Sequence, residues 1–177
     1  MEFRELAIKG VFLIKPVVHY DKRGYFFESF RQDLFERYIG KITFVQDNES
    51  YSKKHVFRGL HYQIPPKAQS KLVKVVYGKI IDIILDLRED SKTYLKYMTL
   101  ELNSENKQQL FIPKGLAHGF YTLSNYAIIN YKVDEYYSKE HERGINMKSL
   151  GMHFPMPPIL SNKDKSLPEL DGITPIT

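Results

Sequence analysis

Apolar and aromatic residues recur along the chain in short runs, and turn-forming residues separate one run from the next. This spacing is typical of β-strands. Many short strands in succession predict a sandwich or a barrel, so the expected fold class is mainly β with short helices. The predicted strand regions are Val11–Val18, Tyr25–Phe30, Ile42–Val45, Leu72–Tyr77, Ile80–Leu87, Tyr97–Leu102, Leu110–Ile112, Gly119–Leu123 and Ala127–Val133.

Four short polar stretches between these runs are predicted to be turns. Asp21–Gly24 and Tyr77–Lys79 combine glycine with charged or polar residues. Asn103–Asn106 and Ser124–Asn125 lie between runs that follow each other closely. Such residues favour tight turns, and we expect the last two stretches to close hairpins.

Two segments depart from the strand pattern. In Arg31–Tyr38, Leu34 and Tyr38 are four residues apart and Gly40 follows as a stop signal, which predicts a helix packed on the sheet as a lid. The tail from Met147 onward is rich in proline and glycine. We expect it to fold back over the body as an ordered loop and not to form a second domain.

Alternation within the strands indicates which side chains share a face. In the strand that ends at Leu87, alternate residues from Ile81 point one way and Asp82 points the other. A buried charge must be paired, so Asp82 is either a hydrogen-bonded structural group or part of a site, and the sequence favours neither. Tyr131 lies between two polar residues and can face the interior.

Composition narrows the class of protein. The 177 residues fit one domain, and we take residues 1–177 as a single unit. The apolar fraction of 42%, with 13 Tyr and 11 Phe, excludes disorder and favours a β-rich interior. The chain has no cysteine, which excludes disulfides, cysteine nucleophiles and thiolate metal sites.

Charge and hydropathy indicate the kind of partner. Met1–Leu6 does not resemble a secretory signal, so we expect a cytoplasmic protein. The longest apolar tract, Leu72–Leu87, contains four charged residues, which excludes a membrane span. The formal net charge is +5, but the lysines are scattered rather than clustered. That pattern favours an anionic small molecule over nucleic acid.

Three segments carry candidate chemistry. Phe57–Gln63 contains an arginine and a histidine, Gln69–Val73 contains a lysine, and Pro113–Phe120 contains a second histidine. The first two segments are predicted to form neighbouring strands. Together these side chains are suited to binding a phosphorylated substrate and moving a proton. We expect the two imidazoles to point into one cavity.

With these motifs, the chain resembles the dTDP-4-dehydrorhamnose 3,5-epimerase family over nearly its whole length. The resemblance implies a cupin-type double-stranded β-helix, or jelly roll, a homodimer, and no cofactor or metal. It also implies inversion of C3 and C5 in a 4-keto-6-deoxy hexose attached to a nucleotide diphosphate. The matching segments are Asp21–Gly24, Phe27–Ser29, Phe44–Asn48, Arg58–Gln63, Gln69–Val73, Asp86–Arg88 with Ser91 and Thr93, Ile112–Phe120, Tyr131-Lys132 and Leu160–Asp164.

The family's chemistry assigns roles to five side chains. Removing a proton beside a ketone creates an enolate, which requires a base, a donor to the oxyanion, and an acid on the opposite face. By resemblance, His61 is the base and Asp164 fixes its tautomer and stabilises the imidazolium. Lys71 would stabilise the enolate. Tyr131 would be the acid, and His118 a polar contact to the sugar.

The resemblance also implies side chains that bind the nucleotide. One guanidinium group can donate two parallel hydrogen bonds to the oxygens of a phosphate, whereas the ammonium of lysine attracts a phosphate as a compact charge. The implied diphosphate ligands are Arg23, Arg58 and Lys163. The implied contacts to sugar and base are Glu28, Gln46 and Asn48, with Tyr137 stacking on the base.

Three alternatives stay open at this point. A metal-dependent cupin would match Pro113–His118, but His61-Tyr62-Gln63 lacks the His-x-His pair that such a centre needs. A relative that inverts one carbon, or shifts the keto group, on another nucleotide sugar would share most of these residues. A binding module without activity is the third. Ser70 and Phe111 depart from the family's usual glycine and tryptophan, which leaves the substrate's identity open.

Overall fold

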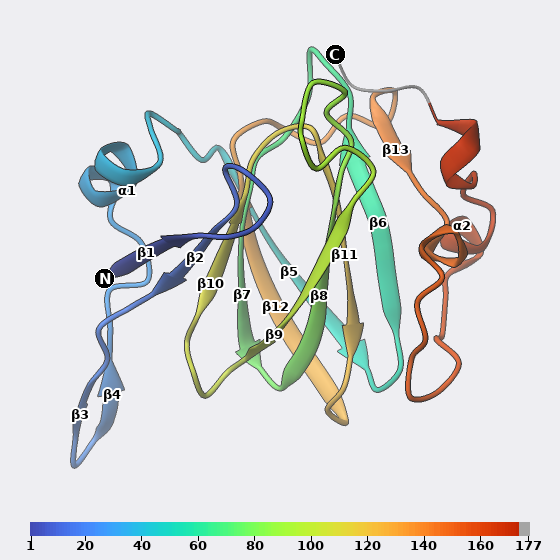
Figure 1. Ribbon diagram of the computed structural model, residues 1–177. Helices are drawn as coiled ribbons and strands as arrows, with labels where there is room; N and C mark the ends of the chain where they lie inside the picture. The colour runs from blue at the N-terminus through green and yellow to red at the C-terminus, as the bar shows by residue number, and fades with distance from the viewer. Residues whose placement is uncertain (174–177) are drawn as a thin grey trace.

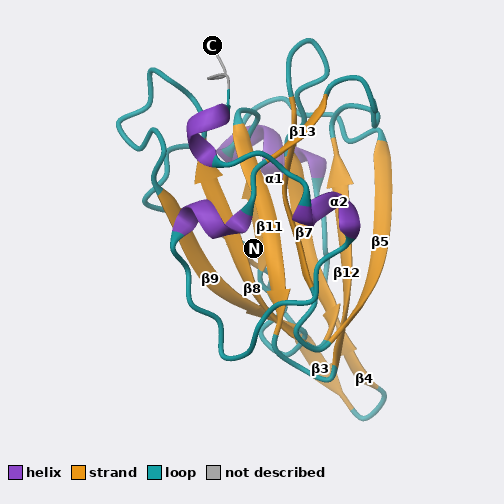
Figure 2. Ribbon diagram, turned by 90° about the vertical axis from the view of Figure 1, so that its right-hand side faces the viewer, coloured by secondary structure: helices purple, strands orange, loops and turns teal. Residues whose placement is uncertain are grey.

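The chain forms two antiparallel sheets that pack face to face (Figures 1 and 2). This is seen in a computed structural model that describes residues 1–173. The first sheet has the order β1 (Glu2–Glu5), β2 (Phe12–Lys15), β10 (Gln109–Ile112), β7 (Lys71–Tyr77), β12 (Tyr126–Val133) and β5 (Gln46–Lys53). The second has the order β13 (Glu142–Gly144), β6 (Phe57–Gln63), β11 (Leu116–Thr122), β8 (Lys79–Asp86) and β9 (Tyr97–Asn103). The predicted mainly β, jelly-roll class is confirmed.

The main core lies between the two sheets, and side chains along β8 alternate between this core and the other face, as predicted. In β8, Ile80 and Ile84 pack into this core, whereas Ile83 and Leu85 point to the other side of the sheet. Both faces of β8 are therefore buried, which explains its nearly continuous run of apolar residues. The core between the sheets is completed by Ile8, Val11, Leu13, Val73, Val75, Leu102, Leu110, Ile112, Leu116, Phe120, Ala127 and Ile129.

Helix α1 (Gln32–Tyr38) covers the outer face of the first sheet, as predicted. Phe35 is fully buried there, and it packs edge-on against Phe111 of β10 with ring centroids 6.4 Å apart. The segment Ile42–Val45, predicted to be a strand, is not one. Ile42 and Phe44 instead pack around Phe35, so they serve the helix rather than a sheet.

The chain after β13 covers the outer face of the second sheet, on the side of the molecule opposite α1 (Figure 1). It contains the helices η1 (Met147–Leu150), α2 (Asn162–Lys165) and η2 (Leu170–Gly172). A parallel bridge between Val56 and Ile159 ties it to the start of β6. The described part of the tail thus folds back over the body, as predicted.

Two predicted hairpins are wrong. Asn103–Asn106 connects β9 to β10, and Ser124–Asn125 connects β11 to β12, yet in each case the two strands belong to different sheets. The local turn residues were identified correctly, but a sandwich lets such a turn pass from one sheet to the other.

One hairpin projects away from the sandwich. Strands β3 (His19–Asp21) and β4 (Gly24–Phe26) pair only with each other, and Figure 1 shows them extending past the sheets. The predicted turn at Asp21–Gly24 is confirmed, and Gly24 has a φ of +128° that favours glycine. Tyr20 and Phe26 are largely exposed on this arm. Among residues 1–173, no helix is long and apolar enough to cross a membrane.

Candidate active site

Two histidines from adjacent strands of the second sheet face the space between the sheets. His61 of β6 and His118 of β11 are register partners. The two strands run unusually close at Gly59, where an added Cβ would lie 2.6 Å from the Cα of Gly119. Gly59 also has a φ of +116°, so this approach depends on glycine.

Lys71 and Tyr131 reach the same space from the first sheet. Lys71 opens β7, and Tyr131 lies on the neighbouring strand β12. The sequence predicted that the lysine strand is a neighbour of β6, which is wrong because β7 and β6 belong to different sheets. The two sheets face each other, so the lysine and the histidines approach the cavity from opposite walls.

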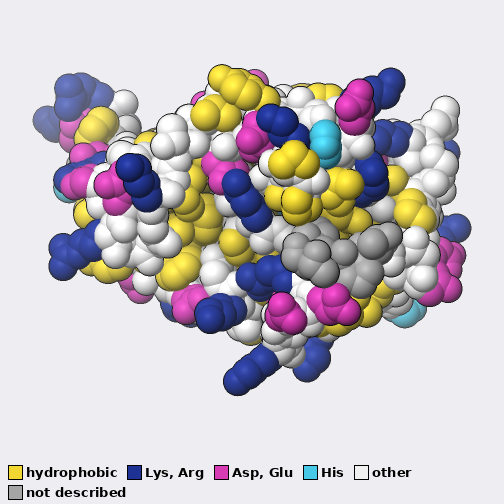
Figure 3. All heavy atoms as spheres, turned by 90° about the horizontal axis from the view of Figure 1, so that it is seen from above, with side chains coloured by type: hydrophobic (Ala, Val, Ile, Leu, Met, Phe, Trp, Pro, Cys, Tyr) yellow, Lys and Arg dark blue, Asp and Glu magenta, His cyan; other side chains and the backbone are white. Residues whose placement is uncertain are grey.

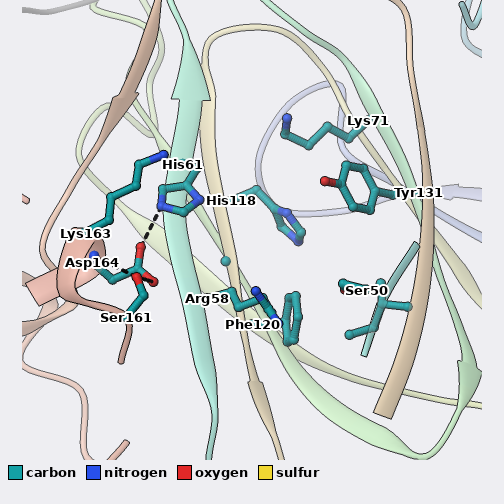
Figure 4. Close-up of a pocket in the computed structure, with 12 residues that line it drawn as sticks. Ser50, Arg58, His61, Lys71, His118, Phe120, Tyr131, Ser161, Lys163 and Asp164 are labelled. Carbon is teal, nitrogen blue, oxygen red and sulfur yellow. Dashed lines mark hydrogen bonds and ion pairs between the residues drawn. The ribbon is translucent and has the colours of Figure 1, made fainter. Parts of the chain in front are cut away.

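These four side chains line one cavity of about 340 Å³ between the sheets. Figure 4 shows His61 and Tyr131 on opposite sides of it, with His118 between them. The predicted convergence of both imidazoles is confirmed. The remaining lining residues are Ser50, Arg58, Gly119, Phe120, Ile129, Ser161, Lys163 and Asp164.

His61 is held by a carboxylate 103 residues later in the chain. Its Nε2 lies 2.7 Å from Oδ1 of Asp164, which is 5% exposed. The hydroxyl of Ser161 donates to the other carboxylate oxygen, and it also accepts from the backbone N–H of Asp164 at the start of α2. Burial raises the pKa of Asp164, but the hydrogen bonds from His61 and Ser161 outweigh it and leave that pKa lowered. Because an ionised carboxylate can only accept, Nε2–H of His61 donates a hydrogen bond to Asp164, and in the neutral imidazole Nδ1 then carries the lone pair.

Lys71 is almost completely buried, with 9% of its surface exposed. Its Nζ donates a hydrogen bond to Oε1 of Gln69 at 3.0 Å. Burial lowers the pKa of Lys71 to about 8, against the raising effect of Asp134 and Glu142. The ammonium is therefore a strong, poorly solvated donor inside the cavity.

Tyr131 keeps its proton at neutral pH. Burial raises the pKa of its phenol above the ordinary value of about 10, and nearby Arg58 only partly opposes this. Its ring packs against the core between the sheets. A protonated phenol therefore faces the imidazole of His61 from the opposite wall.

His118 has a carboxylate partner of its own. Its Nε2 lies 2.8 Å from Oδ2 of Asp82, which is 0% exposed. The sequence left open whether Asp82 was structural or part of a site, and the structure pairs it with a residue of the cavity wall. The other oxygen of Asp82, Oδ1, has no hydrogen-bond partner among the described residues.

The cavity continues into a second space of about 360 Å³, which shares His61, Lys71 and Tyr131. It also contains Glu142 of β13, which the sequence reasoning missed. Glu142 forms an ion pair with Lys163 and accepts a hydrogen bond from the hydroxyl of Tyr137. Glu142 reaches this space through the pairing of β13 with β6, and no local sequence motif predicts that position. The sequence-predicted residues in this second space are Gln46, Asn48 and Tyr137.

Arg58 lies on the wall of the first cavity, near Ser50 and Phe120 (Figure 4). Its Nε donates to Oγ of Ser52 at 2.9 Å, and one terminal nitrogen donates to the carbonyl of Tyr51 at 3.0 Å. These bonds fix the guanidinium plane and leave its other terminal nitrogen for a ligand.

Two predicted site residues lie elsewhere. Arg23 is on the projecting hairpin, where its side chain is 90% exposed and pairs with Asp21. Glu28 follows that hairpin, and its carboxylate lies 3.6 Å from Arg31. Neither residue lines either cavity of its own chain.

The described residues form neither a metal-binding cluster nor, on the face drawn in Figure 3, a strongly basic patch. Within residues 1–173, no three His, Asp or Glu side chains come together in a way that could hold a metal ion. On the face seen in Figure 3, basic and acidic side chains are interspersed, which agrees with the scattered charge in the sequence.

A jelly roll with an imidazole–carboxylate pair and a phenol on opposite walls of one cavity has the groups that an isomerase acting by proton transfer requires. The family model described as dTDP-4-dehydrorhamnose 3,5-epimerase matches residues 5–172. The chain therefore belongs to the dTDP-4-dehydrorhamnose 3,5-epimerase family.

Individual relatives agree with this assignment. The chain is 48% identical over 170 residues to the dTDP-4-dehydrorhamnose 3,5-epimerase of Salmonella typhimurium, covering 93% of each chain. A Legionella pneumophila epimerase, solved in complex with dTDP-4-keto-L-rhamnose, superposes with a TM-score of 0.94 at 38% identity, covering 99% of this chain and 98% of that one. A 3'-monoepimerase from Streptomyces bikiniensis, in complex with dTDP-quinovose, has a TM-score of 0.89 at 29% identity, covering 94% and 86%.

Proposed function

We propose that this protein converts dTDP-4-dehydro-6-deoxy-D-glucose into dTDP-4-dehydro-L-rhamnose by inverting C3 and C5. The observation that carries the proposal is the placement of His61 and Tyr131 on facing sheets across one cavity. Inversion requires that a proton leaves one face of a carbon and returns to the other. A base and an acid on opposite walls meet that requirement.

In the first step, Nδ1 of His61 takes the proton from a carbon beside the C4 ketone. The electron pair of the broken C–H bond forms a double bond between that carbon and C4. The π electrons of the C4 carbonyl move onto its oxygen, which becomes the enolate oxygen. Asp164 stabilises the resulting imidazolium through the 2.7 Å hydrogen bond to Nε2. The ammonium of Lys71 stabilises the enolate oxygen, and its burial strengthens that interaction.

In the second step, the phenol of Tyr131 donates its proton to the same carbon from the opposite face. The enolate collapses to the ketone with the carbon inverted. His61 then loses its proton to solvent and the phenolate of Tyr131 regains one, so no net proton is consumed. The same sequence at the second carbon completes the double inversion.

The nucleotide diphosphate would bind along the mouth of the cavity. Arg58 and Lys163 supply cationic groups on the lining for the phosphates. Gln46, Asn48 and Tyr137 line the second space, where they would contact the sugar and the base. We propose these roles by their position and by the family resemblance.

The experiment that tests the function is NMR of the purified enzyme with dTDP-4-dehydro-6-deoxy-D-glucose in D₂O, with a chelator present. We expect deuterium at both C3 and C5, together with formation of the L-rhamno product. Deuterium at one carbon would assign the chain to the single-carbon epimerases instead. No exchange with this substrate would refute the proposal, and CDP- and GDP-linked ketosugars would then be tested.

Two variants connect the exchange to the site. His61→Ala removes the base, and we expect exchange to fall by about 10²–10⁴-fold. His153→Ala is the matched control, because His153 lies in the segment after η1 and lines neither cavity. Wild-type activity in the His61→Ala variant would show that His61 is not the base.

We further propose that the protein acts as a homodimer in which the projecting hairpin reaches the partner's cavity. Arg23 and Glu28 match substrate-binding positions of the family, yet neither lines a cavity of its own chain. The same arm exposes Tyr20, Tyr25 and Phe26, an apolar surface of the kind that a partner covers. The cytoplasmic location expected from the sequence stays a prediction.

Mixing two variants tests this arrangement. Arg23→Ala alone and His61→Ala alone should each give weakly active protein, because every site of each homodimer lacks one group. When the two are unfolded, mixed and refolded together, a mixed dimer contains one site with His61 from one chain and Arg23 from the other. Recovered activity supports the crossed arm. If native mass spectrometry shows mixed dimers and activity does not recover, the arm does not complete the partner's site.

A further inference from the structure

The cavity contains two histidine–aspartate pairs, and their surroundings differ. Asp164 accepts hydrogen bonds from the hydroxyl of Ser161 as well as from His61, and the pKa of its carboxyl is lowered. Asp82 has His118 as its one hydrogen-bond partner among residues 1–173, and its Oδ1 has none. The same two residue types can therefore be held in different protonation states.

Apolar groups surround Asp82. On the inner face of the second sheet it lies between Phe120 of β11 and Leu100 of β9, its register partners, both of which pack into the core between the sheets. Ile80 and Ile84 of its own strand flank it on the same face. Burial raises the pKa of Asp82, and the group that opposes this is His118.

These surroundings restrict how many protons the Asp82–His118 pair carries. An ionised Asp82 beside a neutral His118 would leave a net negative charge in an apolar interior, which is strongly unfavourable. A pair with no net charge holds one more proton than this. The proton is either on His118, which gives a carboxylate beside an imidazolium, or on Asp82, which gives a carboxylic acid beside a neutral imidazole. Because Nε2 takes part in the bond to Asp82, Nδ1 of His118 carries a proton in both of these forms.

We propose that Asp82 is a positioning residue that keeps Nδ1 of His118 protonated, so that His118 donates a hydrogen bond to the enolate oxygen together with Lys71. This inference rests on the proposed function, and it makes His118 an oxyanion donor instead of a general polar contact to the sugar. The two histidines then differ at Nδ1: His61 presents a lone pair to the substrate, and His118 presents a proton. The different surroundings of Asp164 and Asp82 set this difference.

The protonation state can be measured without substrate. Nitrogen-15 NMR of the wild-type protein labelled at histidine distinguishes a ring nitrogen that carries a proton from one with a lone pair. His118→Gln and His61→Gln assign the signals. At pH 8 we expect a protonated Nδ1 in His118 and an unprotonated Nδ1 in His61. An unprotonated Nδ1 in His118 would overturn the inference, whatever substrate the enzyme uses.

Asp→Asn substitutions at the two pairs should have unequal effects. In Asp82→Asn the amide N–H can donate to Nε2, so His118 keeps the proton on Nδ1, and we expect kcat to fall less than about tenfold. Asp164→Asn removes the negative charge that the imidazolium of His61 needs, and we expect kcat to fall by about 10²-fold or more. An equal loss in both variants would contradict the neutral pair.

The kinetic role of His118 is tested separately. Loss of one donor to a developing oxyanion lowers kcat by about 10²–10³-fold. We therefore expect His118→Phe to lower kcat by that amount with little change in KM. A rise in KM with kcat retained would mean that His118 contacts the bound sugar equally in ground and transition states, which would refute the oxyanion assignment. If the wild-type protein exchanges no deuterium with the dTDP sugar, the proposed function fails, whereas the NMR result on His118 still stands.

Discussion

Lys71→Met should make the protein more stable and nearly inactive. The folded protein lowers the pKa of Lys71 from 10.5 to about 8, mainly because the side chain is buried. Since one pKa unit corresponds to about 1.4 kcal/mol, holding the charged form in the cavity costs about 3 kcal/mol. Methionine has a similar shape and no charge. Allowing for the lost hydrogen bond to Gln69, we expect the free energy of unfolding at pH 7 to rise by about 1–3 kcal/mol.

The lowered pKa of Lys71 also makes the free energy of unfolding depend on pH. Below pH 8, Lys71 is protonated in both the folded and the unfolded states, and the folded state bears the full cost. Between about pH 8 and 10.5 the unfolded state binds more protons, so the contribution of Lys71 to stability becomes less unfavourable as pH rises. The stability advantage of Lys71→Met should therefore shrink across this range.

Activity should follow the charged form of Lys71. If the ammonium stabilises the enolate, kcat/KM halves near pH 8 and falls about tenfold for each further pH unit. Tyr131 does not account for this decline, because burial raises the pKa of its phenol. We expect Lys71→Met to lower kcat by about 10²-fold or more at every pH.

The assays are urea denaturation at pH 7 and pH 10, and deuterium exchange measured from pH 6 to 10. Lys74→Met is the matched control, because Lys74 lies on the same strand with its side chain on the opposite face. We expect its stability to change by less than about 0.5 kcal/mol. A Lys71→Met protein that is less stable than wild type, with no decline in wild-type kcat/KM above pH 8, would refute the reasoning.

Three further predictions concern other parts of the molecule. Tyr131→Phe should still exchange deuterium at the carbons beside the ketone, because His61 remains, but with retention of configuration; NMR showing inversion at the wild-type rate would contradict this. Glu142→Gln removes a charge that raises the pKa of Lys71, so the decline in kcat/KM should move to lower pH, and a shift to higher pH would be the wrong sign. Phe35→Ala should lower the free energy of unfolding by about 3–5 kcal/mol in urea while kcat of the folded protein stays unchanged; a loss below about 1 kcal/mol would show that the site repacks.

Most of the strands and the convergence of the histidines were predictable from the sequence. The alternation in β8 placed Asp82 on the correct face, because the period of a strand is set by backbone geometry. The pairing of Asp164 with His61 required the family resemblance. No local pattern connects residues 103 positions apart, and α2 is a helix of four residues.

The remaining features depend on contacts that local patterns do not encode. Which sheet a strand joins is decided by packing, so the turns at Asn103–Asn106 and Ser124–Asn125 were identified but their connections were not. The outer-face position of Ile42–Val45 depends on the aromatic cluster around Phe35. Glu142 reaches the mouth of the cavity only through the pairing of β13 with β6.

The attachment of Asp164 to the outer segment has a consequence for heat inactivation. The segment from Ile145 to Ile173 contacts the body through side chains on one face of the second sheet, through backbone hydrogen bonds between Ile145 and Leu60, and through the bridge at Ile159. It contributes no strand to the core between the sheets. Segments of this kind open locally at a lower free energy than the sheets they cover. Each opening separates Asp164 from His61 while the two sheets stay folded. Catalytic activity would then disappear on warming before the sheets melt, and it would return on cooling without refolding of the whole chain.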